Sequence, residues 1–391
     1  MVKDMGWRYL GRSGKSVRVL HINGDYRTCN LHGAMKRHLD KMGVKSTVFV
    51  PLSVDKEKIR KTEADASYEY CFNRIDRIFF YRKSGKIRKR LEKIVKNSSF
   101  DVIHAYTLFT NGNVAYEIGK KYKIPYVVAI RNTDIYAFLK YRPYLKKRAI
   151  KILREAKKIF FLSDSYREMF LKKYVPDIYM DDICSKIAVI PNGIDDYWLE
   201  NKFEPDPAET ITLSKHNNIK VIYAGDITKL KNLLPVACAL QELNNEGWNF
   251  SYTIVGEVKE PEIKARLAKY DFIKFISKIT KEELCLEYRK NHIFVMTSLF
   301  ETFGLVYAEA ISQGLPVIYS EGQGFDRQFK EGVVGYHVPP GDVKKIKSAI
   351  MEVIKNYNCL HSNCLKRAEK FSWERICGVY YKIYDELTKN T

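Results

Sequence analysis

The chain is 391 residues long, with 46% hydrophobic and 29% charged residues and a net charge of +21. Domains usually have roughly 100–200 residues, so this length predicts two of them, and the composition excludes a disordered chain. No apolar run approaches the ~20 residues that span a bilayer, and residues 1–7 lack the apolar core of a signal peptide, so we expect a cytoplasmic protein.

The positive charge lies almost entirely in the first half of the chain. Residues 1–200 contain 41 Lys and Arg against 22 Asp and Glu, whereas residues 201–391 contain 26 against 24. Clusters at 82–96 and 146–158 carry much of the excess, and the second interleaves cations with apolar residues, as in an amphipathic helix with a basic face. Such a face suits either solvent or an anionic membrane, and we expect a peripheral contact with the inner face of the cell membrane.

Short β-branched runs alternate with segments of helical spacing in the first half. The predicted strands are 17–23, 46–50, 101–105, 126–131, 158–162 and 187–190. Predicted helices between them include 31–42, 87–96 and 113–123. Alternation of strand and helix predicts a parallel sheet with helices on both faces.

The pattern stops at P-N-G-I-D, 191–195, and a polar stretch with Pro205 and Pro207 follows to about residue 218. Strands are then predicted at 220–224, 251–255, 272–276, 292–297, 316–320 and 336–338. The predicted fold class is therefore α/β, with two facing Rossmann-like domains. Ligands of such sheets bind beyond the carboxyl ends of the strands, so a cleft is expected between the domains.

The most specific segment, S-L-F-E-T-F-G-L-V-Y-A-E-A at 298–310, directly follows a predicted strand. Gly304 permits a close backbone approach, and the helix predicted at 305–312 leaves free amides at its start, a geometry that binds phosphate. Glu301 can accept hydrogen bonds from sugar hydroxyls, and Glu309 could reach a ribose. Alternatively, Glu301 caps the helix electrostatically and Glu309 is a surface residue.

The E-x7-E spacing of Glu301 and Glu309, with E-T-F-G-L at its start, resembles the donor site of glycosyltransferase family 4. The resemblance covers nearly the whole chain, through D-V-I-H at 101–104, I-P-Y-V-V at 124–128, F-L-S at 161–163, I-P-N-G-I-D at 190–195 and G-L-P-V at 314–317. It implies the GT-B architecture of retaining enzymes, with a donor and acceptor cleft between two domains. The implied parts are an acceptor domain at 1–200, a donor domain at 201–370 and a crossover helix at 371–387 that returns to the first domain.

The resemblance also implies roles for individual donor-site residues. Glu301 would contact the donor hexose, Glu309 the ribose, and the amides of Phe303, Gly304 and Leu305 the phosphates. Three glycines at the ends of predicted strands are expected to contact the donor as well: Gly24, Gly225 and Gly256.

The segment D-I-T-K-L-K-N at 226–232 matches the family's G-R-x-x-x-x-K segment, whose two cations neutralise the leaving diphosphate. Lys231 matches the lysine, but Asp226 stands where Arg is usual, and an Asp cannot bind phosphate. Lys229 is either the second cation or an exposed surface lysine. We predict that both lysines bind the donor and that Lys231 takes part in catalysis.

A second departure lies at A-I-R-N-T-D, 129–134, where many family members have a His in the place of Arg131. A guanidinium stays protonated, so Arg131 cannot act as a base, but it can stabilise charge that develops on the diphosphate. A structural ion pair between Arg131 and Asp134 is the alternative. We predict Arg131 as a catalytic residue and place Asn132 and Asp134 on the acceptor side.

No D-x-D occurs in the chain, although metal-dependent glycosyltransferases use such carboxylates to hold a divalent cation. We therefore predict no metal and no cofactor, with Lys231 and helix amides in the place of the metal. The expected co-substrate is a nucleoside-diphosphate sugar of UDP or GDP type. The expected enzyme is a retaining hexosyltransferase that acts on a glycan or lipid-linked acceptor, in bacterial surface polysaccharide synthesis.

Two other functions fit parts of the sequence. Asp226 and Arg131 allow a degenerate GT-B protein that binds a sugar nucleotide or glycan without turnover. The basic half and the 27 tyrosines could track a nucleic-acid backbone, but no RNA- or DNA-binding module pattern is present, so no nucleic-acid partner is expected. His21, His104 and His292 lie in or beside predicted strands, where packing or capping roles are expected.

Overall fold

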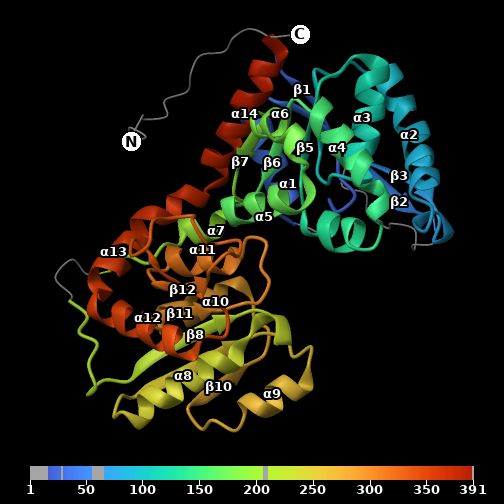
Figure 1. Ribbon diagram of the computed structural model, residues 1–391. Coiled ribbons are helices and arrows are strands. Elements are labelled where there is room, and N and C mark those ends of the chain that lie inside the picture. Colours follow the sequence, from blue (N-terminus) through green and yellow to red (C-terminus); the bar gives the residue numbers. More distant parts are fainter. Residues whose placement is uncertain (1–15, 28–29, 55–65, 206–209, 390–391) are drawn as a thin grey trace.

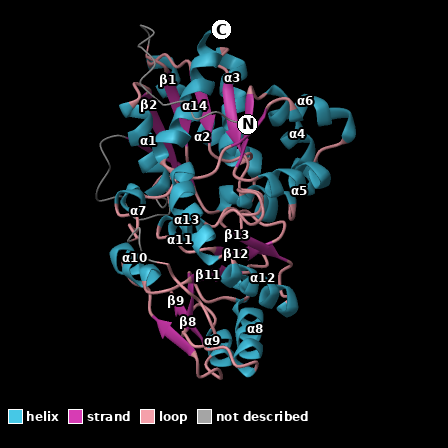
Figure 2. Ribbon diagram, turned by 90° about the vertical axis from the view of Figure 1, so that its left-hand side faces the viewer, coloured by secondary structure: helices cyan, strands magenta, loops and turns pink. Residues whose placement is uncertain are grey.

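The computed structural model describes residues 16–27, 30–54, 66–205 and 210–389, so residues 1–7 and Pro207 lie outside the described residues. The chain forms two parallel β-sheets with helices between the strands, one sheet in each half (Figures 1 and 2). The predicted α/β class is thus confirmed.

The first sheet has seven parallel strands in the order β3-β2-β1-β4-β5-β6-β7. Its strands are β1 (Arg18–Ile22), β2 (Lys45–Ser53), β3 (Ala66–Phe72), β4 (Val102–Ala105), β5 (Tyr126–Ala129), β6 (Lys158–Phe161) and β7 (Ile187–Val189). All four residues of β4 and of β5 are buried, as is usual where helices cover both faces of a parallel sheet. The order reverses between β1 and β4, which is where ligands of such sheets bind.

Strand β3 has no counterpart among the predicted strands. It lies at one edge of the sheet, it pairs only with β2, and its first five residues are half-buried. A half-buried strand mixes polar and apolar residues, so A-S-Y-E-Y-C-F lacks the apolar run that marks the buried strands.

Seven helices of the first half follow these strands in the described residues: α1 (Asn30–Lys41), α2 (Phe80–Asn97), α3 (Thr110–Tyr122), α4 (Lys146–Glu155), α5 (Asp164–Tyr174), α6 (Met180–Cys184) and α7 (Asp196–Glu200). Four short helical turns join them: η1 (Ile75–Arg77), η2 (Asp134–Leu139), η3 (Pro143–Leu145) and η4 (Asp177–Tyr179). Helix α2 begins seven residues before the predicted start, because apolar Phe80 and a buried Ser84 extend its inner face by two turns.

The second sheet has six parallel strands in the order β10-β9-β8-β11-β12-β13. Its strands are β8 (Ile219–Ala224), β9 (Phe250–Val255), β10 (Ile273–Ile276), β11 (Ile293–Met296), β12 (Val317–Ser320) and β13 (Gly335–Val338). Its helical segments are η5 (Lys229–Lys231), α8 (Leu233–Asn245), α9 (Pro261–Leu267), α10 (Lys281–Arg289), α11 (Leu305–Ser312), α12 (Val343–Lys355), α13 (Tyr357–Arg367) and η6 (Ala368–Phe371). Each predicted strand of this half has its counterpart, and the helix predicted at 305–312 is α11.

The last helix, α14 (Trp373–Lys389), leaves the second sheet and packs on the first, where it contacts α1 and β4 (Figure 1, red). Its buried residues Trp373, Tyr380 and Tyr384 share a core with Val19 of β1. A Cβ on Gly193 would lie 2.4 Å from the Trp373 ring, so only glycine lets the linker pass this helix. Of the helices that the structure describes, none is both long and apolar enough to cross a membrane.

Candidate functional site

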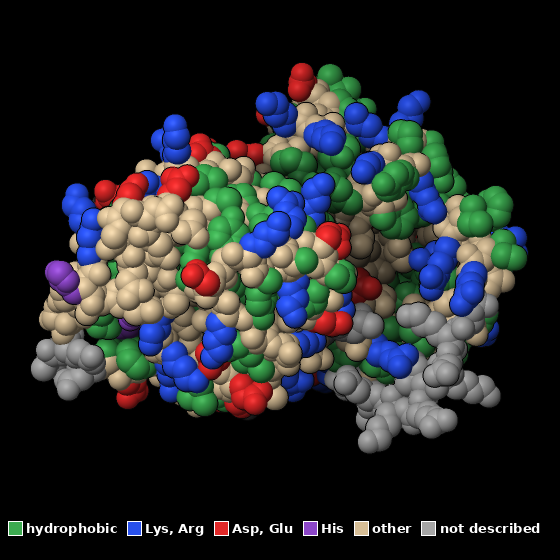
Figure 3. Space-filling view, turned by 90° about the horizontal axis from the view of Figure 1, so that it is seen from below, with side chains coloured by type: hydrophobic (Ala, Val, Ile, Leu, Met, Phe, Trp, Pro, Cys, Tyr) green, Lys and Arg blue, Asp and Glu red, His purple; other side chains and the backbone are tan. Residues whose placement is uncertain are grey.

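Loops that follow strands of the two sheets meet between the halves of the molecule. Tyr136 in η2 packs its ring edge-on against Phe300, which follows β11, with 4.4 Å between the ring centroids. In a second contact between the halves, the Gln328 side chain donates to the carbonyl of Leu162 at 3.2 Å. Figure 3, seen from the end of the second half, shows a hollow in the right part of this face with Lys and Arg side chains around it. Most of the predicted site residues belong to these loops, and Leu305 and Glu309 belong to the helix that follows one of them.

Two predicted residues form the central contact of the site. Lys231 Nζ lies 2.7 Å from Glu301 Oε2, and both side chains are partly exposed, at 26% and 17%. The second oxygen of Glu301 accepts the amide of Thr302 at 3.1 Å. The predicted cation and the predicted sugar-binding carboxylate are therefore neighbours.

The order of the second sheet explains this contact. Lys231 follows β8 and Glu301 follows β11, and these two strands are neighbours at the point where the strand order reverses. Two hydrogen bonds tie the loops together: the amide of Leu299 donates to the carbonyl of Leu230 at 2.9 Å, and Asn232 Nδ2 donates to the carbonyl of Thr297 at 3.0 Å.

The backbone of Glu301 is held from a third loop. Gln323 Oε1 accepts the Glu301 amide at 2.9 Å, and the amide of Gly324 donates to the Glu301 carbonyl at 2.9 Å. A Cβ on Gly324 would lie 2.2 Å from the Thr302 backbone, so only glycine fits here. Gln323 is not among the predicted site residues, although a polar residue between two glycines just after a predicted strand is a signal for such a site.

The amino end of α11 has the backbone geometry expected of a phosphate site. Gly304 has φ +79° and begins the helix from the left-handed region, where glycine is favoured. The Phe303 side chain is 2% exposed and packs against Phe371, with 5.7 Å between ring centroids, so only its backbone can face a ligand. The first amides of a helix have no partner within the helix, and these lie next to Glu301.

Glu309 lies on α11, partly exposed. Burial, together with the nearby carboxylate of Asp195, raises the pKa of Glu309 to about 7. Glu309 is therefore not a freely solvated surface carboxylate. Within the described part of the chain, it also forms no ion pair. A ligand that donates hydrogen bonds would stabilise its ionised form.

Two of the three glycines predicted at strand ends have backbone roles in the structure. Gly225 and Gly256 follow β8 and β9 with φ +146° and +152°, and a Cβ on Gly256 would lie 1.9 Å from the Gly225 carbonyl oxygen. Gly24 follows β1, and a Cβ added to it would come no closer than 4.0 Å to Asn111 Oδ1, so space does not require a glycine there. All three lie at the carboxyl ends of strands, and their contact with the donor stays a prediction.

Lys229 and Asp226 are both exposed beside this site. The backbone amide of Lys229 donates to Glu260 Oε2 at 3.1 Å. This hydrogen bond does not involve the ammonium group of Lys229. The carbonyl of Asp226 accepts the Tyr223 hydroxyl at 2.8 Å. Donor binding by Lys229 stays a prediction.

Arg131 follows β5 and is half-buried on the side of the first sheet. Its side chain hydrogen-bonds Tyr380 of α14, and burial together with the Arg131 charge lowers the pKa of His32 to about 3. Arg131 thus places a permanent positive charge at the strand ends. Its role in catalysis stays a prediction.

Asp134 has backbone partners in the structure, and its predicted place on the acceptor side stays a prediction. Asp134 is fully buried, and its carboxylate accepts the backbone amides of Leu108 at 2.9 Å, Phe109 at 3.1 Å and Arg131 at 2.9 Å. It satisfies amides in front of α3 from more than twenty residues away, so local spacing could not reveal it. Because Asp134 meets the Arg131 backbone rather than its guanidinium, the alternative ion pair is not formed.

Asn132 and the histidines complete the first half of the site. Asn132 Oδ1 is buried without a hydrogen-bond partner in the described part of the chain, so an acceptor-side role stays a prediction. The expected packing and capping roles of the histidines are confirmed. His21 Nδ1 lies 3.2 Å from the Tyr106 hydroxyl, His104 Nδ1 lies 2.6 Å from the Tyr384 hydroxyl, and His292 accepts the Lys220 amide at 3.0 Å.

Two family models match the chain in succession. Residues 34–197 match the model described as "Glycosyltransferase Family 4", and residues 208–371 match the one described as "Glycosyl transferases group 1". A curated relative, the UDP-Gal:alpha-D-GlcNAc-diphosphoundecaprenol alpha-1,3-galactosyltransferase of Escherichia coli, is 28% identical over 298 residues, which are 70% of this chain and 72% of the relative.

Solved structures show the same two-domain fold. Sucrose-phosphate synthase from Thermosynechococcus elongatus superposes with a TM-score of 0.72 and 16% identity, over 96% of this chain and 100% of that one. The Anabaena protein HepE, solved in complex with UDP and glucose, has a TM-score of 0.65 and 16% identity, over 95% and 100% of the two chains. These likenesses confirm the predicted GT-B architecture.

Proposed function

The chain belongs to the glycosyltransferases of group 1, with a family 4 domain in its first half, and on this premise we propose that it transfers a hexose from a nucleoside-diphosphate sugar to a lipid-linked or glycan acceptor. The observation that carries the proposal is the Lys231–Glu301 contact of 2.7 Å beside the amino end of α11. A diphosphate needs a cation and amide donors, and a hexose needs a carboxylate close by.

Each part of this site has a task in the proposed transfer. The bond between the sugar C1 and the diphosphate oxygen breaks, and its electron pair leaves with the diphosphate, where Lys231 and the amides of residues 303–305 stabilise the charge. The acceptor hydroxyl bonds to C1 on the same face and passes its proton to the leaving phosphate oxygen, so the anomeric configuration is retained. Glu301 orients the hexose, and Arg131 adds a positive charge that cannot act as a base.

We propose that the transfer needs neither a metal nor a resident cofactor. The proposal is supported by the contact of Lys231 with Glu301 just before α11, because an ammonium group and helix amides can offset the charge of a diphosphate without a metal. A UDP-sugar is the first donor to test, because the E. coli relative is named for UDP-Gal and HepE was solved with UDP.

A lipid-linked acceptor is the preferred class. The E. coli relative is named for a diphosphoundecaprenol acceptor, which is held in a membrane. We propose a role in bacterial surface polysaccharide synthesis at the inner face of the cell membrane. The net charge of +21 favours approach to an anionic surface.

Thermal unfolding with UDP- and GDP-sugars in the presence of EDTA tests the donor. Ligand at about 100 times its Kd adds ~2.7 kcal/mol to the free energy of unfolding, so a selective rise in Tm that survives EDTA is expected. No rise with any sugar nucleotide would contradict the proposal.

Transfer is tested with the Glu301→Gln variant and with product analysis. Glu301→Gln is expected to keep nucleotide binding and lose transfer, whereas Glu246→Gln, which also removes a lysine-paired carboxylate, should leave transfer unchanged. NMR of the product should show the anomeric configuration of the donor. Binding without turnover in the unchanged protein would favour the degenerate alternative.

A further inference from the structure

Exposed apolar side chains gather in two short segments of the first half. Of the thirteen large hydrophobic residues that are exposed in the described chain, seven belong to 75–81 and 136–144, with exposed fractions between 42% and 70%. We name them the edge patch: Ile75, Ile78, Phe79, Tyr81, Tyr136, Tyr141 and Tyr144. Single exposed hydrophobic residues are ordinary, but a contiguous group marks a contact surface.

The two segments adjoin in space. Arg142 Nη2 donates to the carbonyl of Arg77 at 2.8 Å, which joins the end of η1 to the segment between η2 and η3. Phe80 of the first segment also contacts Phe138 of the second, with 6.1 Å between the ring centroids. The edge patch is therefore one surface.

The charges of this surface are almost all positive. Residues 74–83 and 136–144 contain six Lys and Arg and a single acid, Asp76. Asp76 is fully buried and neutralised by Arg82 at 2.9 Å and Lys86 at 2.7 Å. Exposed apolar groups thus alternate with cations in these two segments. Neither segment has an exposed carboxylate.

One lysine of this surface is partly withdrawn from solvent. Lys83 lies 4.4 Å over the Phe72 ring. Burial is the main cause that lowers the pKa of Lys83 to about 8; the charges of Arg77 and Arg142 add to it, and the exposed carboxylate of Asp25 opposes it. An anionic partner would act in the same direction as Asp25.

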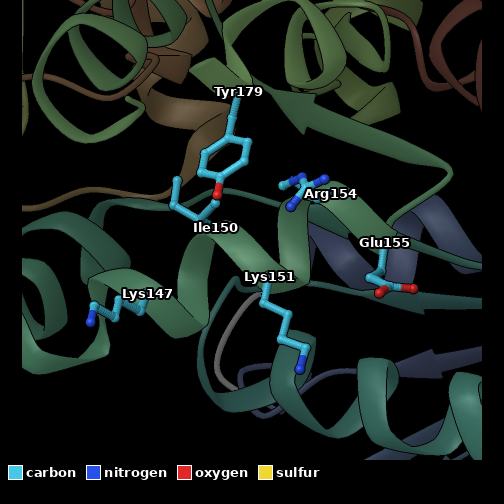
Figure 4. A pocket seen from close by; sticks show the side chains of 6 residues that line it. All are labelled: Lys147, Ile150, Lys151, Arg154, Glu155 and Tyr179. Carbon is cyan, nitrogen blue, oxygen red and sulfur yellow. The ribbon is translucent and has the colours of Figure 1, made fainter. Parts of the chain in front are cut away.

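The positive surface continues into α4, which begins directly after η3. A pocket of about 310 Å³ on this helix is lined by three cations, Lys147, Lys151 and Arg154, and one acid, Glu155, with Ile150 and Tyr179 (Figure 4). The Arg154 guanidinium lies 4.4 Å over the Tyr179 ring. Figure 3 shows hydrophobic and basic side chains close together on the right of its face, the side on which α2 lies in Figure 1.

One end of the edge patch reaches the proposed active site. The Tyr136 ring contacts Phe300, which directly precedes Glu301. A molecule anchored at the patch would therefore find the donor loop beside it.

We infer that the edge patch docks on an anionic lipid bilayer, with its aromatic residues in the interface and its cations against the headgroups. The choice of a bilayer rests partly on the proposed function, because a lipid-linked acceptor is held in one. Aromatic rings with a polar tip favour the bilayer interface, and cations are attracted to anionic headgroups. Docking at this edge would bring the acceptor to Tyr136 and Glu301 without lifting it from the membrane.

Co-sedimentation of the full chain with vesicles tests the inference. The unchanged protein is expected to bind phosphatidylcholine vesicles that contain phosphatidylglycerol, to bind pure phosphatidylcholine far less, and to dissociate at high salt. The double variant Phe79→Ser, Tyr141→Ser should lose at least tenfold in partitioning. The matched double variant Leu286→Ser, Val379→Ser removes exposed apolar residues elsewhere and should bind as before.

A charge series separates this surface from general attraction. Lys140→Gln, Lys146→Gln and Lys147→Gln together should weaken binding by about fivefold for each cation. Lys344→Gln, Lys345→Gln and Lys355→Gln, exposed lysines of α12, should have little effect. Equal losses in both triple variants would overturn the inference, because the charge would then act without a defined face.

Two further results would also overturn it. One is failure of the unchanged protein to bind anionic vesicles while it still gains stability from a UDP-sugar, and this result would leave the proposed function standing. The other is a dimer that the Phe79→Ser, Tyr141→Ser variant converts to a monomer, since the patch would then be a protein interface. Vesicle binding without any effect of a sugar nucleotide would instead refute the proposed function alone.

Discussion

Lys231 Nζ and Glu301 Oε2 lie 2.7 Å apart, and both side chains are partly exposed. Ion pairs of this kind contribute about 0–1 kcal/mol to stability. The contact is therefore important for the positions of the two charges and has little effect on folding. When a diphosphate binds, Lys231 can exchange the carboxylate for phosphate oxygens, because both accept hydrogen bonds from an ammonium group.

Gln323 is a positioning residue for Glu301. Gln323→Leu leaves the Glu301 amide without its acceptor, at a cost of about 1–3 kcal/mol, and lets the carboxylate move. We expect kcat to fall at least tenfold while the KM for the donor changes little. Gln241→Leu removes a glutamine that bonds Asn245 on α8 and should not affect kcat. A kcat that stays within twofold in Gln323→Leu would remove this role.

Glu309 should make donor binding depend on pH. Its raised pKa of about 7 means that the free protein loses the carboxylate charge as the pH falls below neutral. If the carboxylate accepts hydrogen bonds from the ribose, affinity for a UDP-sugar is full above this pKa and falls about tenfold for each pH unit below it. Calorimetric titration across this range measures the slope, and Glu309→Gln should abolish it. A slope that persists in Glu309→Gln would assign the titration to another group.

At the scale of secondary-structure elements, the loops after β8 and β9 depend on two glycines. Gly225 and Gly256 both have positive φ, and their backbones approach so closely that no Cβ fits between them. This packing lets the turn that carries Lys231 begin directly at the end of β8. The carboxyl ends of the parallel strands form one edge of the sheet, and the two glycines let the loops after β8 and β9 pack close to this edge.

Gly256→Ala should destabilise the protein and weaken donor binding together. A Cβ 1.9 Å from the Gly225 oxygen forces the two loops apart, and we expect a loss of about 1–3 kcal/mol in the free energy of unfolding. Gly378→Ala is the matched control, because nothing lies within 4 Å of its new Cβ in α14 and alanine favours a helix by about 1 kcal/mol. Urea unfolding of both variants measures the contrast. Equal effects would show that Gly256 is not constrained.

At the scale of the whole molecule, α14 joins the end of the chain to its first sheet. Its buried side chains share a core with β1, α1 and β4, although the second sheet lies between them in sequence. The linker is fixed at the same place, because the amide of Ile194 donates to the carbonyl of Phe371 at 3.0 Å. The chain therefore passes between the two halves twice, once at Ile194 and once after Phe371, and these two crossings lie side by side.

A truncated chain that ends at Ser372 lacks α14. It should lose stability in the first half of the molecule, although the deletion lies at the other end of the sequence. Without α14, the apolar surface over β1 and β4 is open to water, so amides of β1, β4 and α1 should exchange faster with deuterium. Amides of β8 and β11 should keep their protection, because their core contains no residue of α14. Hydrogen exchange with mass spectrometry resolves the two groups. Uniform acceleration in both sheets would contradict this account.

Much of the fold could be predicted from the sequence because its signals are local. Apolar runs of strand length and helical spacing placed all strands but β3, whose half-buried position gives it no apolar run. The start of α11, with Gly304 at a positive φ and Glu301 just before it, lies within one short segment. Asp134 shows the limit: the distant backbone amides that surround its carboxylate cannot be read from local spacing.

The sequence by itself determined the α/β class, the succession of two sheets and the loop and helix start around Glu301, because periodicity, turn residues and helix starts are properties of neighbouring residues. Only the tertiary structure decided that Lys231 meets Glu301, that Gln323 holds it, and that the apolar residues of 75–81 face outward. These facts depend on which strands are neighbours and which segments cover which faces. Such contacts join residues far apart in the chain, and spacing along the chain does not encode them.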